Sequence, residues 1–429
     1  MTVFNSSQNN SSAADDLDAA DPLKDFRAQF EIPKTKEGSD CLYFCGHSLG
    51  LMPKQTRQVI AAECDAWGAL GVEGHFDAKH PWLPYHEFLT EGLTRIVGAQ
   101  SEEVVAMNGL TTNLHLMLVS FYRPTKNKFK ILIENNTFPS DKYAVDSQAR
   151  FHGYDPNEAI IELRPRDGEL RVREEDLEEQ IAKHGDQLAL IMLGNCNYLS
   201  GQCFDFKKIT ELGHSHDAMV GFNLAHGAGN LELSLHDWNV DFAVWCSYKY
   251  LNSGPGGIAG AFVHKNHLGR ADLPRFEGWW GTNKETRFKM QSQIDPIPTV
   301  EAWQLSNPPI FQLAALRSSL EIFDQAKMSR IVAKRNKLSS YLEFLLSENV
   351  GQFVEIMTPA FVEGAQKRGA MLSVRMKQDP KKLISVFAER GVILDFREPD
   401  ILRMAPAPLY NSYRDVFDLV QIIKEVSHA

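Results

Sequence analysis

The sequence of 429 residues lacks the features that mark several large classes of protein. It contains no apolar run of about eighteen residues, so we predict no membrane-spanning helix. It has no CxxC pair, no HExxH motif and no GxxxxGK(S/T) loop, which argues against a zinc site and a nucleotide phosphate site. Its 45 basic residues are scattered and its net charge is −10. We therefore expect no nucleic-acid or membrane partner, and no metal.

The N-terminal segment, residues 1–23, is polar, acidic and low in complexity. It has neither the basic nor the apolar part of a signal peptide, and its composition predicts a disordered tail. Six cysteines occur in this long chain without a secretory signal. We expect free thiols in a reducing compartment, and hence a cytoplasmic protein.

The rest of the chain predicts a large α/β domain, residues 24–310, and a smaller α+β domain, residues 311–429. Apolar segments separated by helical or loop stretches indicate a mainly parallel sheet, with strands at 130–133, 189–193, 219–223 and 242–247. Helices are expected at 56–71, from near Ser140, and around 313–323. Strands of the smaller domain are expected at 371–376 and 391–394.

Three segments bring reactive or anchoring groups to the carboxyl ends of the strands, where open parallel sheets bind ligands: 138–141, 221–226 and 245–250. Lys249 follows an apolar strand and precedes a glycine-rich loop. Partial desolvation there would lower its pKa and make it a nucleophile for Schiff-base chemistry. Taken alone, a solvated lysine at a strand end is the more common arrangement.

Other residues near these strand ends also allow two interpretations. Phe138 could stack on a flat heteroaromatic ring or simply pack inside the protein. A helix starting at Thr111 or Thr112 could hold a phosphate with its free N–H groups, or need no ligand. His226 could contact a ligand or be a hydrogen-bonded structural histidine.

Longer motifs make the sequence similar to the kynureninase family. The matching runs are YFCGHSLGL at 43–51, FPSD at 138–141, LAH at 224–226, WCSYKYLN at 245–252, GGIAG at 256–260, RFKM at 287–290, SNPP at 306–309, LRMAP at 402–406 and PLYNS at 408–412. The resemblance extends from about residue 40 to about residue 415, with the motifs in the same order. Such long motifs make chance agreement a poor explanation.

The resemblance implies fold type I of the pyridoxal 5'-phosphate (PLP) transferases, and a homodimer with its active sites at the subunit interface. It implies PLP as cofactor and hydrolytic Cβ–Cγ cleavage of L-kynurenine or 3-hydroxy-L-kynurenine. The products are anthranilate or 3-hydroxyanthranilate, and L-alanine. Because His75 and Asn307 fall where animal enzymes contact the hydroxylated ring, the 3-hydroxy substrate is the expected preference.

The resemblance also assigns roles to residues. Lys249 would hold the cofactor covalently and take the Cα proton, Tyr248 would donate a later proton, and Arg403 would bind the substrate carboxylate with its planar fork. The cofactor-binding set would be Leu110, Thr111, Phe138, Ser140, Asp141, Asn223, His226, Tyr248, Lys249, Trp279 and Asn307. Trp279 and Asn307 would come from the partner subunit.

Two positions depart from the family pattern. Asn223 stands where the family has an aspartate that pairs with the protonated pyridine nitrogen, and Gly194 stands in place of a serine. A hydrogen bond to a charged group contributes ~1.5–3 kcal/mol, and a change of ~1.4 kcal/mol in the activation free energy changes the rate tenfold. The sequence therefore predicts activity at least roughly ten- to a hundredfold below that of an Asn223→Asp variant.

Two other functions were weighed. A cysteine desulfurase of the same fold needs a nucleophilic cysteine well after the lysine, but the last cysteine, Cys246, precedes Lys249. A PLP-binding homologue with little catalysis and a binding or regulatory role is supported by Asn223 alone. Lys249, Tyr248, His226 and Arg403 argue against it.

Overall fold

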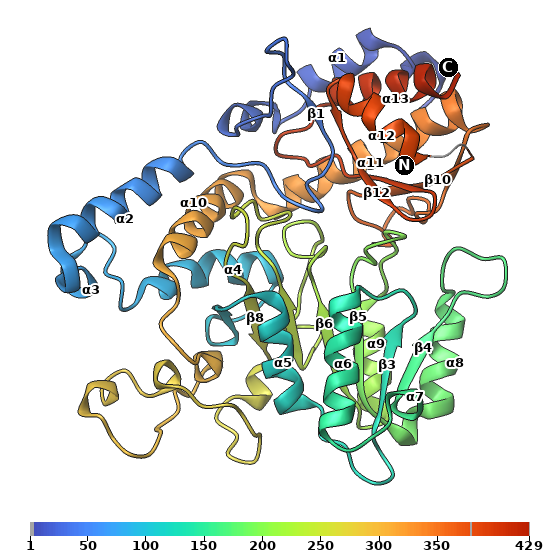
Figure 1. Ribbon diagram of the computed structural model, residues 1–429. Helices are drawn as coiled ribbons and strands as arrows, with labels where there is room; N and C mark the ends of the chain where they lie inside the picture. The colour runs from blue at the N-terminus through green and yellow to red at the C-terminus, as the bar shows by residue number, and fades with distance from the viewer. Residues whose placement is uncertain (1–3, 378–379, 429) are drawn as a thin grey trace.

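A seven-stranded sheet forms the centre of the computed structural model, which describes residues 4–377 and 380–428 (Figure 1). The strand order is β2-β8-β7-β6-β5-β3-β4, and β8 alone runs antiparallel to its neighbours. The strands are β2 Val104–Ala106, β3 Lys130–Glu134, β4 Ile160–Leu163, β5 Leu188–Gly194, β6 Met219–Asn223, β7 Phe242–Trp245 and β8 Gly260–Val263. The four strands expected from the sequence are β3, β5, β6 and β7.

The central strands are buried on both faces, which is why they are almost continuously apolar. Successive side chains point to opposite faces of a strand. In β3, Ile131 and Ile133 join a core with helices α5 and α6, whereas Leu132 joins a second core with α4, α8, α9 and α10. Helices therefore cover both faces, and the carboxyl ends of the parallel strands are left as the binding edge.

The helices of this part are α2 Thr56–Leu70, α3 Gly74–Asp77, α4 Thr90–Val97, α5 Leu110–Phe121, α6 Pro139–Phe151, α7 Pro156–Ala159, α8 Glu174–His184, α9 Phe206–Ser215 and α10 Ile310–Ala326. The expected helix starts near residues 56 and 140 agree with α2 and α6. Figure 1 places α2 and α3 at the far left, away from the sheet.

The C-terminal unit has its own antiparallel sheet, in the order β12-β13-β10-β9. Its strands are β9 Val354–Ile356, β10 Leu372–Met376, β12 Asp395–Arg397 and β13 Ile401–Met404. Its helices are α11 Met328–Val350, α12 Pro380–Glu389 and α13 Tyr413–His428. A separate parallel pair joins β1 Leu42–Tyr43 to β11 Val392–Ile393, so an early segment of the chain is part of this unit.

The boundary between the two cores falls within α11. Leu313 and Leu320 of α10, and Ile331 of α11, pack into the core of the large unit, whereas Leu338 and the residues after it pack into the C-terminal core. The sequence placed the start of the smaller domain at residue 311. The domain boundaries expected from the sequence, 24–310 and 311–429, stay a prediction.

The N-terminal segment differs from the disordered tail expected at residues 1–23. Residues 6–8 form a 3-10 turn and α1 spans Ser11–Ala19, capped by the side chain of Asn10. Helix α1 packs against α13, and Phe4 and Ala14 belong to the C-terminal core. Because the N-terminal segment is mostly polar, its few buried apolar residues were not recognised in the sequence. Residues 1–3 lie outside the described part of the chain.

Among the described residues no helix is long and apolar enough to cross a membrane. All six cysteines are free, as expected.

Candidate functional site

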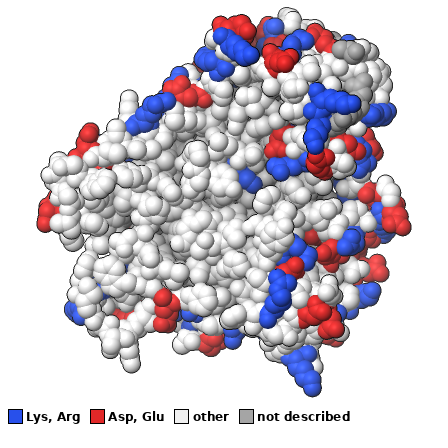
Figure 2. Space-filling view, in the orientation of Figure 1, with Lys and Arg blue, Asp and Glu red and all other residues white. Residues whose placement is uncertain are grey.

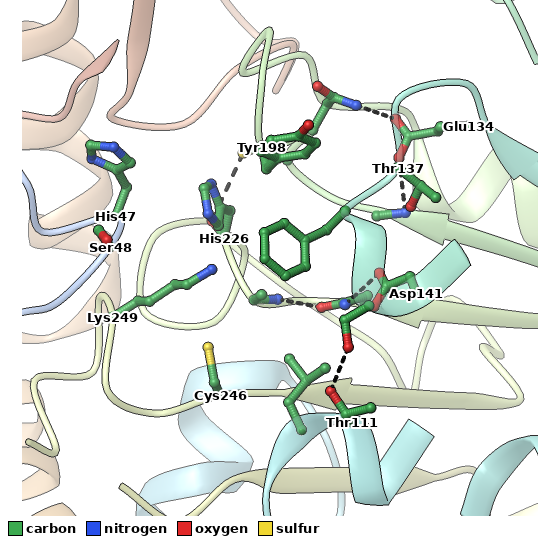
Figure 3. A pocket seen from close by; sticks show the side chains of 18 of the residues that line it. His47, Ser48, Thr111, Glu134, Thr137, Asp141, Tyr198, His226, Cys246 and Lys249 are labelled. Atoms are coloured by element: carbon green, nitrogen blue, oxygen red, sulfur yellow. Dashed lines mark hydrogen bonds between the residues drawn. The ribbon is translucent and has the colours of Figure 1, made fainter. Parts of the chain in front are cut away.

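A cavity of about 340 Å³ opens where β3, β5, β6 and β7 end, and Arg397 of β12 and Arg403 of β13 line it from the C-terminal unit. Figure 3 shows its lining side chains. Most residues singled out from the sequence line it: Leu110, Thr111, Phe138, Ser140, Asp141, Asn223, His226, Tyr248, Lys249 and Arg403. Their positions make a common site possible, and their individual roles remain predictions.

Lys249 enters this cavity from the segment that follows β7. Its side chain is half-buried, and its Nζ lies 5.9 Å from the centroid of the Phe138 ring. Burial lowers the pKa of Lys249, and the Arg403 guanidinium adds to this effect, while Cys246 and Asp141 oppose it. A larger neutral fraction makes the amine a better nucleophile and base. Lys249 is therefore not a fully solvated lysine at a strand end.

The amino ends of α5 and α6 meet at the lower edge of the cavity. Gly109 is the N-cap of α5, and no side chain of the described residues caps it. Thr111 lies in the first turn, where its Oγ1 is 2.8 Å from the Ser140 Oγ of α6. The helix therefore begins one residue before the threonines that the sequence suggested. Free N–H groups and hydroxyls at helix amino ends suit a phosphate.

Asn223 and Asp141 are hydrogen-bonded beside Phe138. Asn223 donates from Nδ2 to Asp141 Oδ2 over 2.7 Å and accepts on Oδ1 from the N–H of Ala225 over 2.9 Å. Burial raises the pKa of Asp141 to about 6, although the Asn223 bond and the Lys249 charge oppose the shift. Asp141 Oδ1 has no hydrogen-bond partner within the described chain.

Glu134 is a lining residue that the sequence analysis missed. It ends β3, and its carboxyl accepts from the N–H of Gly194 over 3.0 Å and from Asn197 Nδ2 over 3.4 Å. Burial raises the pKa of Glu134 to about 8, so the group is mostly neutral at pH 7. Gly194 is the second departure from the family pattern, and a Cβ there would lie 3.1 Å from Glu134 Oε2. The sequence did offer one signal for Glu134, which is a single acidic residue at the end of an otherwise apolar strand.

Two buried histidines also face the cavity. His226 was expected, and its Nδ1 has no partner in the described residues. His47 was not expected: it is fully buried, neither ring nitrogen has a hydrogen-bond partner among the described residues, and its Nε2 lies 3.7 Å from Asp395 Oδ2. Their ring centroids are 6.1 Å apart. Burial lowers the pKa of both, and nearby Arg403 and Lys249 add to the shift, so both rings are neutral at pH 7.

Arg403 and Arg397 reach the cavity from β13 and β12. Arg403 donates from Nη2 to Asp395 Oδ2 over 2.6 Å and from Nη1 to the carbonyl of Tyr198 over 2.5 Å. Arg397 Nε lies 2.9 Å from Asp395 Oδ1. Two guanidinium groups around one carboxylate leave net positive charge at this end of the cavity. The site can therefore attract an anion at its upper edge.

The cysteines at the site argue against a thiol nucleophile. Cys196 and Cys246 line the cavity, and Cys196 Sγ lies 2.7 Å from Cys203 Sγ. Burial raises the pKa of Cys203 and of Cys246, which keeps both thiols protonated. A desulfurase thiolate has no counterpart among them.

Three of the predicted site residues lie outside the cavity in this chain. His75 is in α3, where its ring packs edge-on against Trp82 at 5.4 Å. Trp279 is 41% exposed and donates to the carbonyl of Arg287, and Asn307 is exposed just before α10. The supply of Trp279 and Asn307 by a partner subunit stays a prediction.

Two clusters elsewhere have metal-ligand composition: Glu103, His236 and His264, and His86, Glu87 and Glu301. In the first, Glu103 already accepts from His236 over 2.9 Å. In the second, Lys284 Nζ bonds both Glu87 and Glu301. The carboxylates of both clusters are thus already bonded to His236 or Lys284, and none of the six clustered residues lines the cavity.

Comparisons with known proteins show which family the chain is similar to. Residues 331–423 match the family described as the kynureninase C-terminal domain. The chain is 55% identical to a kynureninase from Myxococcus xanthus, with 97% of each chain covered. It is 52% identical to one from Koribacter versatilis, covering 95% of each, and 44% identical to one from Nematostella vectensis, covering 96% of this chain and 92% of that one.

Solved structures support the fold. A cysteine desulfurase from Escherichia coli aligns with a TM-score of 0.75 at 17% identity, covering 94% of this chain and 97% of that one. A cystine C–S lyase bound to cysteine persulfide aligns with a TM-score of 0.75 at 16% identity, covering 90% and 97%. The architecture is that of fold type I, an α/β fold with a mainly parallel sheet and a smaller α+β unit. At such low identity the likeness concerns the fold alone.

Proposed function

The chain belongs to the kynureninase family, and we propose on this basis that its cavity binds PLP and hydrolyses the Cβ–Cγ bond of L-kynurenine or 3-hydroxy-L-kynurenine. The products are anthranilate or 3-hydroxyanthranilate, and L-alanine. The observation that carries the proposal at the site is Lys249, a half-buried amine of lowered pKa facing an aromatic ring at the sheet edge.

The residues of the cavity fit PLP. The uncapped amino end of α5, with Thr111 and Ser140 beside it, suits the phosphate. The Phe138 ring, 44% exposed in this chain, offers a face for the pyridine ring. Asp141 Oδ1 is a buried acceptor without a partner in the described residues, which suits a ring N–H.

When bound, PLP supplies an electron sink for charge that develops on the substrate. Lys249 would hold the cofactor and, once released, accept the Cα proton on Nζ, for which a lowered pKa is suited. Burial raises the pKa of the Tyr248 hydroxyl, so this group stays protonated and can donate a proton later in the reaction. Arg403 would bind the substrate carboxylate, sharing its donors with Asp395.

We further propose a homodimer in which Trp279 and Asn307 complete the partner's cavity. Large apolar side chains are exposed on α2, α3 and the loop before α10, among them Trp67, Phe76 and Phe288. Figure 2 shows that charged residues gather along the top and right of this face, while the left and centre are mostly uncharged. Exposed apolar surface of this kind is typical of a protein interface.

His75 and Asn307 would then contact the aromatic ring of the substrate, and a preference for 3-hydroxykynurenine is proposed. A cytoplasmic location is also proposed, and the six free cysteines support it.

The test is a cofactor and product assay on the purified protein. We expect a visible absorption band with PLP, which borohydride converts to a pyridoxyl group that peptide mass mapping locates on Lys249. We also expect anthranilate fluorescence from L-kynurenine, with the 3-hydroxy substrate compared at equal concentration. A colourless protein, or a modification elsewhere, would overturn the proposal. A band without product would favour the weakly catalytic homologue.

The shared site has its own test by mixing two inactive variants. Lys249→Ala and Trp279→Ala proteins are dissociated, mixed and reassembled. A mixed dimer contains one cavity with both native residues, so we expect activity that neither variant shows alone, up to about one quarter of the wild-type value for random pairing. If dimers form but no activity returns, Trp279 does not act in the cavity of the partner subunit.

A further inference from the structure

Asn223 and Asp141 form a buried amide–carboxylate pair in the lining of the cavity, where Asp141 is labelled in Figure 3. Asn223 Nδ2 donates to Asp141 Oδ2 over 2.7 Å, and its Oδ1 accepts from the N–H of Ala225 over 2.9 Å. These bonds fix the direction of the amide, because a flipped amide would set oxygen against carboxylate and NH₂ against N–H. Asn223 therefore presents a donor to Asp141.

The other oxygen of Asp141 is prepared for a ligand. Asp141 is 5% exposed, and its Oδ1 has no hydrogen-bond partner in the described part of the chain. A buried polar atom left unpaired costs free energy, so a group that fills the cavity is the natural partner. Asp141 lies in the first turn of α6, where the helix dipole favours a negative charge.

Asp141 is also the carboxyl group of the cavity that carries charge. Of the described lining residues only Glu134 and Asp141 are acids. Both Glu134 oxygens already accept hydrogen bonds, and its pKa of about 8 leaves it mostly neutral at pH 7. The pKa of Asp141, about 6, leaves it mostly ionised.

Building on the PLP-dependent function proposed above, we infer that Asp141 supplies the negative charge facing the ring nitrogen of the cofactor, and that Asn223 is the positioning residue that holds this carboxylate. PLP offers a phosphate, which a carboxylate repels, and a ring nitrogen, which donates to a carboxylate once protonated. Asp141 Oδ1 is the acceptor such an N–H needs. Asp141, which is hydrogen-bonded to Asn223, then supplies the negative charge that the amide at position 223 lacks.

This arrangement changes the expectation for an aspartate at position 223. Asn223→Asp would set two carboxyl groups within hydrogen-bonding distance, and such pairs share one proton. The pair would still carry about one negative charge. We therefore expect kcat to change by less than about tenfold, whereas the sequence alone indicated a gain of roughly ten- to a hundredfold.

Four proteins test the pair: the wild type, Asp141→Asn, Asn223→Asp, and the exchanged double variant carrying both. Each is loaded with PLP labelled with ¹⁵N in the ring, and the ¹⁵N chemical shift reports whether that nitrogen is protonated. We expect a protonated nitrogen in the wild type, in Asn223→Asp and in the double variant, but a neutral one in Asp141→Asn. We expect kcat to fall at least tenfold in Asp141→Asn and to recover at least partly in the double variant.

Asp146→Asn is the matched control, because Asp146 lies on the same helix, pairs with Lys142 and does not line the cavity. It should leave both readouts unchanged. A tenfold or larger gain in Asn223→Asp, or a protonated nitrogen in Asp141→Asn at an unchanged rate, would overturn the inference. Should Asp141→Asn not fold by circular dichroism, the rate of Asn223→Asp decides. Failure of the wild type to bind PLP at Lys249 would instead refute the proposed function.

Discussion

The two walls of the cavity hold their charged groups in different ways. On the wall formed by the strand ends, Asp141 keeps one oxygen without a partner in the described residues. On the wall formed by β12 and β13, Arg403 is already bound to Asp395 and to the Tyr198 carbonyl. A buried polar group without a partner suits a ligand that stays bound. Each time the ligand left, the free-energy cost of the unpaired group would return. A cation that keeps its partners suits a ligand that comes and goes.

We therefore propose that the sheet wall holds a permanent cofactor and that the C-terminal wall binds a transient anion. Substitutions on the first wall should therefore change kcat and the cofactor spectrum. Substitutions on the second wall should mainly change KM.

The largest expected effect comes from the sheet wall. Lys249→Ala removes the amine that would hold the cofactor and take the Cα proton, and we expect kcat to fall by about 1,000-fold or more. Anthranilate fluorescence measures the rate, and borohydride labelling should be lost. Lys142→Ala, which changes a lysine paired with Asp146 outside the cavity, is the control. A rate within tenfold of the wild type would remove Lys249 from the chemistry.

An intermediate effect is expected on the C-terminal wall. Arg403→Lys keeps the charge but loses the planar fork, and we expect KM for kynurenine to rise roughly ten- to a hundredfold with a smaller change in kcat. Steady-state kinetics separate the two constants. Arg375→Lys, on strand β10 of the same sheet, is the matched control. A fall in kcat at constant KM would contradict the division between the walls.

The smallest effect concerns Glu134 and protein stability. Its folded-state pKa of about 8 lies above its ordinary value of 4.5, so the folded chain binds this proton more tightly than the unfolded chain. The contribution of this proton to the free energy of unfolding is fully present below pH 4.5 and is lost as the pH rises through about 8. Glu134→Gln mimics the protonated carboxyl, so its melting temperature, measured by calorimetry from pH 6 to 9, should decline less than that of the wild type. Equal slopes would show that Glu134 does not titrate there.

Local patterns in the sequence predicted the centre of the fold. The strands at β3, β5, β6 and β7 are apolar because both faces are buried, and that pattern can be read without a structure. Short strands such as β12 and β13 escaped, because three or four residues give no periodicity to detect. The boundary inside α11 and the packing of α1 depend on contacts with distant segments, which local patterns do not contain.

The site divides in the same way. Motifs near strand ends indicated Lys249, Phe138 and Asn223, but they did not show which residue Asn223 contacts. Its bond to Asp141 joins residues 82 positions apart, and in the inference above Asp141 would supply the charge that the amide lacks. Arg403 likewise meets the Tyr198 carbonyl across 205 positions. Chemistry that depends on such pairs is visible only once the chain is folded.

The packing of Phe4 and Ala14 into the C-terminal core also bears on the order of folding. Their partners on α11 and α13 lie several hundred residues further along the chain. Contacts between such distant segments slow folding because a long loop must close first. We therefore expect the contacts between α1 and α13 to form late in folding.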